Sequence, residues 1–60
     1  MKTWLQINRN NDVYRHNEYG DEPDLIGSIE GELDGNRWFM MRGDNRTLNV
    51  EELQQILDFL

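Results

Sequence analysis

Cysteine is absent from this 60-residue chain, and proline and histidine each occur once. Without cysteine the chain can form neither a disulfide framework nor a thiolate metal site. A chain this short buries only about 60% of the surface that it exposes when unfolded. Its stability must therefore come from one small apolar core or from association with a second copy. We treat residues 1–60 as a single domain.

Long hydrophobic stretches are missing as well. No apolar run approaches the roughly 20 residues that a membrane-spanning helix needs. The sequence turns polar soon after Lys2, Thr3 and Trp4, which does not fit the apolar centre of a signal peptide. Together with the lack of cysteine, this pattern favours a cytoplasmic protein that does not bind membranes.

Basic residues are missing from the middle of the chain. Residues 18–34 hold seven acids and no Lys or Arg, and the net charge of the whole chain is −6. Such a field repels nucleic acid and favours a protein partner with a basic surface. A charge run is usually a solvated face, but carboxylates at intervals can also imitate nucleic-acid phosphates. Both interpretations of residues 18–34 stay open.

The residue sets that carry catalysis or cofactor binding are missing too. His16 is the single histidine; Glu18 would share its strand face, but no nucleophile is matched to it. The acidic stretch from Asp21 to Asp24 lacks the ligand spacing of a calcium-binding loop. The regularly spaced glycines of residues 27–35 are not followed by the Lys-Ser/Thr of a phosphate-binding loop. We therefore expect no enzyme, no cofactor and no metal.

The clearest feature that the sequence does contain is a hairpin over residues 25–42. Asp34-Gly35 between two apolar runs predicts a two-residue turn, because both central residues of such a turn need positive φ. This turn pairs Glu32 with Arg37 and continues along both strands, and directly opposed residues share a face. One face would carry Leu33, Gly31, Trp38, Ile29 and Met40, and the other Glu32, Arg37, Glu30, Phe39, Ser28 and Met41. A three-residue loop would reverse the faces of one strand.

The rest of the chain predicts two more strands and a helix. Residues 3–8 and 13–19 alternate as strands do, and the Asn-rich residues 8–12 form a turn between them. Asn49 can cap a helix that runs to the chain end, with Glu52 at the third helical position as in a capping box. An apolar stripe at helical spacing follows: Val50, Leu53, Ile56, Leu57 and Leu60. The predicted fold is α+β, a small four-stranded antiparallel sheet of two hairpins with the C-terminal helix on one face.

The predicted helix is about 18 Å long and cannot cover both faces of the sheet. Its stripe should cover Leu5, Ile7, Ile29, Leu33, Trp38 and Met40. The uncovered face should then carry Trp4, Phe39, Met41 and Ile26. An exposed apolar patch usually marks an interaction site, and aromatic residues, Met and Arg are enriched at interfaces. The predicted partner-binding residues are Trp4, Glu30, Glu32, Asp34, Arg37, Phe39 and Met41.

Three functions fit these features. The first is a small acidic protein-binding module that inhibits or regulates a protein partner through the uncovered sheet face. The second is a nucleic-acid mimic that occupies the basic groove of a nuclease or DNA-binding complex. The third is a structural or assembly subunit that self-associates, with a homodimer through the same face. Short, acidic, cysteine-free chains of this kind occur in phage and mobile-element genomes.

Overall fold

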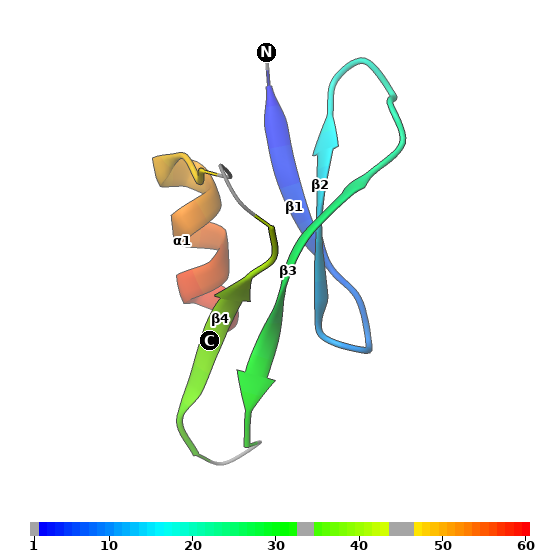
Figure 1. Ribbon diagram of the computed structural model, residues 1–60. Helices are drawn as coiled ribbons and strands as arrows, with labels where there is room; N and C mark the ends of the chain where they lie inside the picture. The colour runs from blue at the N-terminus through cyan, green and yellow to red at the C-terminus, as the bar shows by residue number, and fades with distance from the viewer. Residues whose placement is uncertain (1, 33–34, 44–46) are drawn as a thin grey trace.

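The computed structural model describes residues 2–32, 35–43 and 47–60. The elements follow one another as β1 (Thr3–Ile7), β2 (Asp12–Asn17), β3 (Asp24–Gly31), β4 (Arg37–Met41) and α1 (Val50–Phe59). The strands form one antiparallel sheet in the order β1-β2-β3-β4, and α1 packs on it (Figure 1). The predicted α+β fold of four strands and one C-terminal helix is confirmed.

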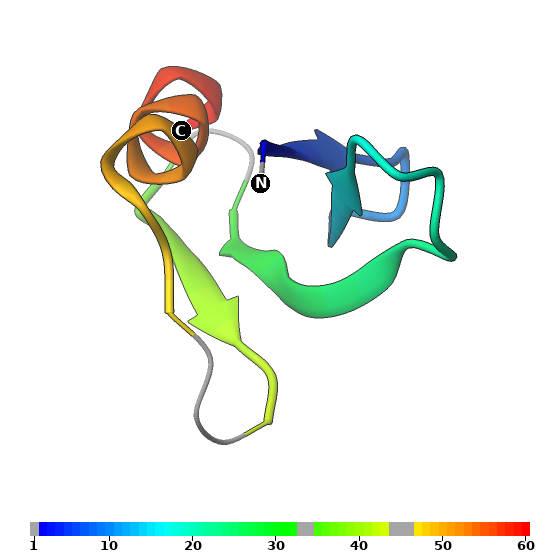
Figure 2. The same ribbon diagram turned by 90° about the horizontal axis from the view of Figure 1, so that it is seen from above.

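The sheet is strongly curled, and α1 lies over its concave side. In Figure 2 β1 lies to the right of the helix and β4 below it, although the two strands are the opposite edges of the sheet. The guanidinium carbon of Arg37 in β4 lies 4.9 Å from the ring centroid of Phe59 in α1. Gln55 of α1 hydrogen-bonds the backbone of Leu5 in β1. The helix thus defines an inner face of the sheet, toward α1, and an outer face, away from it.

Asn8 shapes the turn between β1 and β2. Its side-chain oxygen accepts hydrogen bonds from the backbone N–H groups of Asn10 and Asp12, each at 3.0 Å. Asn11 has a φ of 65°, in the left-handed region that Asn adopts more readily than most residues. The strands then pair back to Thr3 and Asn17. The predicted hairpin is present, although β2 ends at Asn17 and the predicted strand ended at residue 19.

The β3–β4 hairpin is present as well, but its predicted register is wrong by one residue. The structure pairs Glu30 with Trp38, whereas a two-residue turn would place Glu30 opposite Phe39. The observed pairing leaves residues 32–36 as the connection. Asp34, the first residue of the predicted turn, lies outside the described residues. Because side chains alternate along a strand, this slip exchanges the two faces of β4 relative to the prediction.

The observed register turns Phe39 to the inner face, opposite Ile29, and Trp38 to the outer face. Gly27 makes this possible. A Cβ atom built on Gly27 would lie 2.6 Å from the Phe39 ring and closer still to the carbonyl oxygen of Met40. A strand glycine thus lies under an aromatic ring, with Gly27 beneath Phe39.

The core lies between the inner face and α1. Its buried apolar members come from β1, β2, β3 and the helix: Leu5, Val13, Ile26, Ile29 and Ile56. Three partly buried side chains pack against them: Ile7, Phe39 and Leu48. The pairing of β2 with β3 is irregular next to Val13, where Val13 pairs with Gly27 and the next residue pairs with Leu25. This irregularity leaves Ile26 unpaired and wholly buried, so its predicted place on the uncovered face is wrong.

The start of α1 is confirmed as predicted. The side-chain oxygen of Asn49 accepts a hydrogen bond from the Glu52 backbone N–H at 2.8 Å. The Glu52 carboxylate in turn accepts one from the Asn49 backbone N–H at 3.0 Å. This reciprocal arrangement satisfies two backbone donors that a helix start otherwise leaves without intrahelical partners.

The side of α1 that faces the sheet differs from the prediction. Of the predicted stripe only Ile56 is buried, and the other buried helical residue is Glu52. The reason is polar anchoring. Glu52 binds Arg15 of β2, and Gln55 binds the Leu5 backbone of β1. These hydrogen bonds turn the helix so that most of its apolar stripe points to solvent.

Candidate protein-binding surface

The outer face of β4 carries two large apolar side chains next to each other. Trp38 is 50% exposed and Met40 is 53% exposed, and both pair with polar residues of β3, Glu30 and Ser28. Trp38 also borders a hollow of about 290 Å³ that Gly31, Glu32 and Asn36 complete. We call Trp38, Met40 and this hollow the β4 patch.

The free edge of β4 is open along the β4 patch. The backbone N–H of Arg42 donates to the Ile26 carbonyl at 2.8 Å. In an antiparallel pair the backbone groups of successive residues point alternately toward and away from the neighbouring strand. Trp38 and Met40 therefore point their backbone groups toward β3, as Arg42 does, and Arg37, Phe39 and Met41 point theirs away from it. No hydrogen bond to the outward backbone groups occurs among the residues that the structure describes. An edge of this kind is a template for pairing with another strand.

The opposite edge of the sheet is covered at its middle residue, Leu5. The Gln55 side chain of α1 accepts a hydrogen bond from the Leu5 backbone N–H at 3.1 Å and donates one to the Leu5 carbonyl at 3.4 Å. One helical amide thus replaces the strand that would otherwise lie beside the middle of β1. Natural proteins commonly cover an edge strand in this way. The contrast between the two edges makes β4 the candidate for strand addition.

The structure does not gather the sequence-predicted binding residues into one surface. Trp4 is 41% exposed on the outer face, but it belongs to β1 at the other edge of the sheet. Its ring stacks on His16, with the centroids 5.8 Å apart, and His16 Nε2 lies 2.6 Å from Gln6 Oε1. Because a Gln oxygen only accepts, the histidine nitrogen donates this hydrogen bond. Trp4 is therefore part of a separate aromatic pair.

The remaining predicted binding residues divide between the faces. Glu30 is exposed on the outer face, and Glu32 is exposed just beyond β3. Phe39, Arg37 and Met41 share the inner face, so their predicted place on the uncovered face is wrong; Phe39 packs on the core and Met41 stays 38% exposed at the edge. Asp34 lies outside the described residues. The binding role of all these residues stays a prediction.

Sequence reasoning missed Trp38 and Met40 as surface residues because it assigned them to the core. The signal that could have placed them is the pair of glycines in β3. Either Gly27 or Gly31 could lie beneath an aromatic ring, and only the choice of Gly27 turns Phe39 inward and Trp38 outward. The prediction instead followed the Asp34-Gly35 turn motif, which set the register that places Trp38 in the core.

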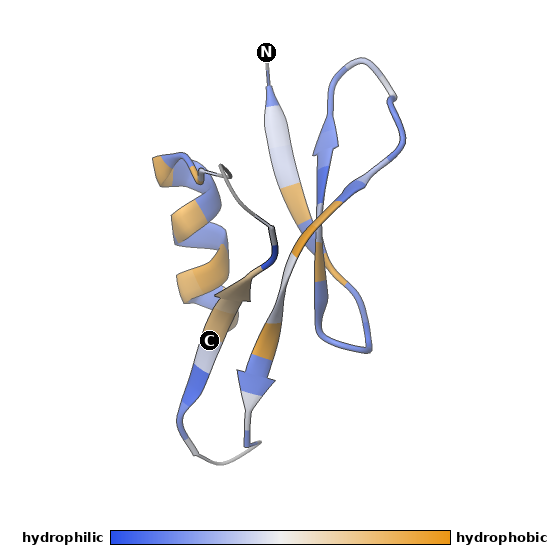
Figure 3. Ribbon diagram, in the orientation of Figure 1, coloured by the Kyte–Doolittle hydropathy of each residue, from blue (hydrophilic) through white to orange (hydrophobic). Residues whose placement is uncertain are grey.

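A second apolar surface lies along α1. Four members of the predicted stripe are exposed: Val50 by 80%, Leu53 by 46%, Leu57 by 64% and Leu60 by 42%. In Figure 3 the hydrophobic segments recur on successive turns along one side of the helix. We call these four residues the helix stripe. Their exposure follows directly from the polar anchors that fix the opposite side of α1.

Glu52 is the centre of a polar cluster beneath the helix start. Its side chain is 2% exposed and accepts hydrogen bonds from Arg15 Nε at 2.7 Å, Arg15 Nη2 at 3.0 Å and the Thr3 hydroxyl at 3.1 Å. Arg15 also donates to the Thr47 carbonyl. Burial alone raises the pKa of Glu52, but the hydrogen bonds from Arg15, the Asn49 backbone and Thr3, with the charge of Arg15, lower it below its ordinary value.

These contacts give the cluster a structural role. A buried carboxylate with this many donors is fully satisfied and has no free lone pair aimed at solvent. The cluster ties β1, β2 and the residue before the helix to one side chain. It was not predicted, because nothing in the sequence pattern matches Arg15 with Glu52.

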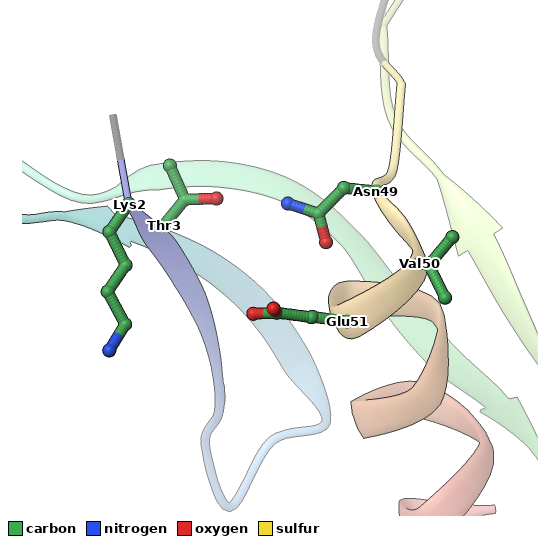
Figure 4. Close-up of a pocket in the computed structure, with 5 residues that line it drawn as sticks. All are labelled: Lys2, Thr3, Asn49, Val50 and Glu51. Carbon is green, nitrogen blue, oxygen red and sulfur yellow. The ribbon is translucent and has the colours of Figure 1, made fainter.

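The hollow beside the helix start is lined mainly by polar side chains, and Figure 4 shows the Glu51 carboxylate pointing from α1 toward β1. It has a volume of about 440 Å³ and lies between the beginning of β1 and α1. In Figure 4 the Thr3 hydroxyl faces Asn49, the Lys2 amine extends away from the helix, and Val50 points to the other side. The anion-attracting helix start is already occupied by the Glu52 carboxylate.

Among the described residues, His, Asp and Glu form no group of three or more that could hold a metal ion. Within the same part of the chain, no helix is long and apolar enough to cross a membrane. Comparison with known proteins gives no match to a family model, to a curated protein or to a solved structure. The function is therefore argued from the surfaces themselves.

Proposed function

We propose that the protein is a non-catalytic cytoplasmic binding module that inhibits or regulates a protein partner through the β4 patch and the free edge of β4. The observation that carries the proposal is the side-by-side exposure of Trp38 and Met40 on an edge strand whose outward backbone groups have no partner among the described residues. A partner strand can add main-chain hydrogen bonds along such an edge while side-chain contacts supply specificity.

The chemistry of the patch indicates the kind of partner. Trp and Met are enriched at protein interfaces because they bury large, adaptable surfaces. The exposed carboxylates of Glu30 and Glu32 flank the patch, and the net charge of the chain is −6. A partner that presents an extended apolar segment beside basic side chains fits this surface.

The test is affinity purification from the source cell with the wild-type chain and two variants as bait. The double variant Trp38→Ala/Met40→Ala should lose the specific partner. The matched control is Tyr19→Ala, which removes an aromatic side chain that is 70% exposed in the loop after β2, and it should retain the partner. If every captured protein binds the double variant as well as the wild type, the proposal is wrong.

Salt dependence separates this function from nucleic-acid mimicry. The structure places Asp24 at the start of β3 and Glu30 near its end, about 20 Å apart along the strand, with no charged residue between them. A mimic would lose its partner steeply with rising salt and on charge reversal of Glu30 and Glu32. A partner held by the β4 patch would respond mainly to Trp38 and Met40.

A further inference from the structure

The helix stripe is an apolar surface with a symmetric spacing. Its members Val50, Leu53, Leu57 and Leu60 are separated by three, four and three residues. When two such helices lie antiparallel about a twofold axis at residue 55, Val50 of one copy meets the partner's Leu60. Leu53 likewise meets the partner's Leu57. A surface that matches itself in this way is what a twofold dimer interface requires.

The charges of α1 leave the stripe free for close approach. A helix turns by about 100° per residue, so Glu51 and Asp58 lie about a third of a turn from the centre of the stripe. Glu52 faces the sheet and is neutralised by Arg15. Two chains of net charge −6 repel each other at long range, but this contact places no carboxylate against another. Antiparallel helices also place opposite dipole ends side by side.

The molecule exposes more surface than a compact monomer of its size. Its accessible area is 4714 Å², against about 4,100 Å² for a typical folded monomer of 7.2 kDa. Its radius of gyration is 11.6 Å, against about 10.4 Å for a compact chain of 60 residues. The chain is thus less compact than a typical monomer of its size, and the exposed helix stripe is part of its accessible surface.

We infer that α1 is a homodimer interface, in which the helix stripe packs antiparallel against the helix stripe of a second copy. A second copy is the occupant because the stripe is complementary to itself and because a chain of 60 residues gains the core that it lacks from its own duplicate. This surface is distinct from the β4 patch. The dimer therefore presents two copies of that patch.

Sedimentation velocity over a micromolar to submillimolar concentration range tests the inference. The wild-type chain should sediment as a dimer, and higher salt should not dissociate it, because the contact is apolar. Leu53→Gln/Leu57→Gln should raise the dimer dissociation constant by about 100-fold or more, since four leucines leave the interface. Circular dichroism checks that this variant stays folded. Trp38→Ala/Met40→Ala should remain dimeric.

Two results of this experiment would overturn the inference. One is a wild-type chain that stays monomeric over the whole concentration range. A stripe that binds only a different protein would give this result. The other is a dimer that survives in Leu53→Gln/Leu57→Gln and dissociates in Trp38→Ala/Met40→Ala. The partner-binding role of the β4 patch could still hold in either case, so the two proposals fail separately.

Cysteine cross-linking tests the geometry without depending on the stability of a leucine variant. Because the chain has no cysteine, a mixture of Val50→Cys and Leu60→Cys chains offers a single route to a disulfide-linked heterodimer. The antiparallel contact brings these positions together. Two Val50→Cys chains should not cross-link, because their cysteines would lie at opposite ends of the pair, about 15 Å apart. Equal cross-linking in both samples would contradict the antiparallel arrangement.

Discussion

At the scale of single residues, Glu52 links functions that are usually carried by separate side chains. It completes the capping box, pairs with Arg15 and accepts a hydrogen bond from Thr3. The capping role was predictable from the order Asn-Val-Glu-Glu, because it depends on local spacing. The pairing with Arg15 was not, because it joins residues 37 positions apart and depends on how the helix is turned.

Glu52→Gln should therefore destabilise the fold far more than a surface substitution. Removing one partner of a buried ion pair costs about 3 kcal/mol at the low end of the usual range, which suits a pair whose arginine is partly exposed. The expected total stability of the chain is only about 3–9 kcal/mol. Urea unfolding at neutral pH measures the loss. Glu51→Gln, at the exposed neighbouring position of the same helical turn, should change stability by about 1 kcal/mol or less.

The same pair predicts how stability depends on pH. Because the folded-state pKa of Glu52 is lowered, its ionised form stabilises the native state. This contribution is fully present above the unfolded-state pKa of about 4.3 and is lost as the pH falls through the lower folded-state value. The difference in stability between wild type and Glu52→Gln should thus shrink below about pH 4.3. A difference that stays constant into strong acid would contradict the assignment.

Gly27→Ala should destabilise the protein by about 1–3 kcal/mol, because the added methyl group would press on both the Met40 carbonyl oxygen and the Phe39 ring. Thermal or urea unfolding measures the effect, with Ser28→Ala on the outer face as a control that should have little effect. Combining Gly27→Ala with Phe39→Leu should cost less than the sum of the two changes, since the smaller side chain makes room. Strict additivity would mean that the contact with the Met40 carbonyl, rather than the Phe39 ring, sets the cost of the added methyl group.

At the scale of elements, the sequence predicted what each segment forms better than which way it faces. The capping box and the alternation of β1 are local signals, and both were right. The direction of the helix stripe and the faces of β4 depend on contacts between distant segments. Gln55 illustrates the limit: in the sequence it resembles its neighbour Gln54, yet only Gln55 reaches the edge of β1.

Gln55→Ala should loosen that edge. It removes the two hydrogen bonds to the Leu5 backbone and should cost about 1–2 kcal/mol. The Leu5 amide should also exchange its hydrogen faster, as measured by NMR. Gln54→Ala is the matched control, because it removes an exposed hydrogen bond to Asp58 within the same helix and should cost about 0.5 kcal/mol or less. Equal effects of the two changes would show that Gln55 does not protect the strand.

At the scale of the whole molecule, the fold presents two apolar surfaces of different kinds. The helix stripe is complementary to itself, whereas the β4 patch combines side chains with open backbone groups. Because the core is small, the chain has little stability to spare while both apolar surfaces stay exposed. The fold class could be predicted from the sequence, but the separation of these surfaces could not. It follows from the one-residue slip of β4 against β3 and from the rotation of α1 about its own axis.

The polar cluster around Glu52 also has a consequence for the order of folding. Its hydrogen bonds join Glu52 to residues 37 and 49 positions away, so large loops must close before they form. The two hairpins need only short loops. The docking of α1 should therefore follow the transition state. In stopped-flow measurements Glu52→Gln should speed unfolding by about 100-fold and leave the folding rate nearly unchanged; a slower folding rate would instead place the helix in the folding nucleus.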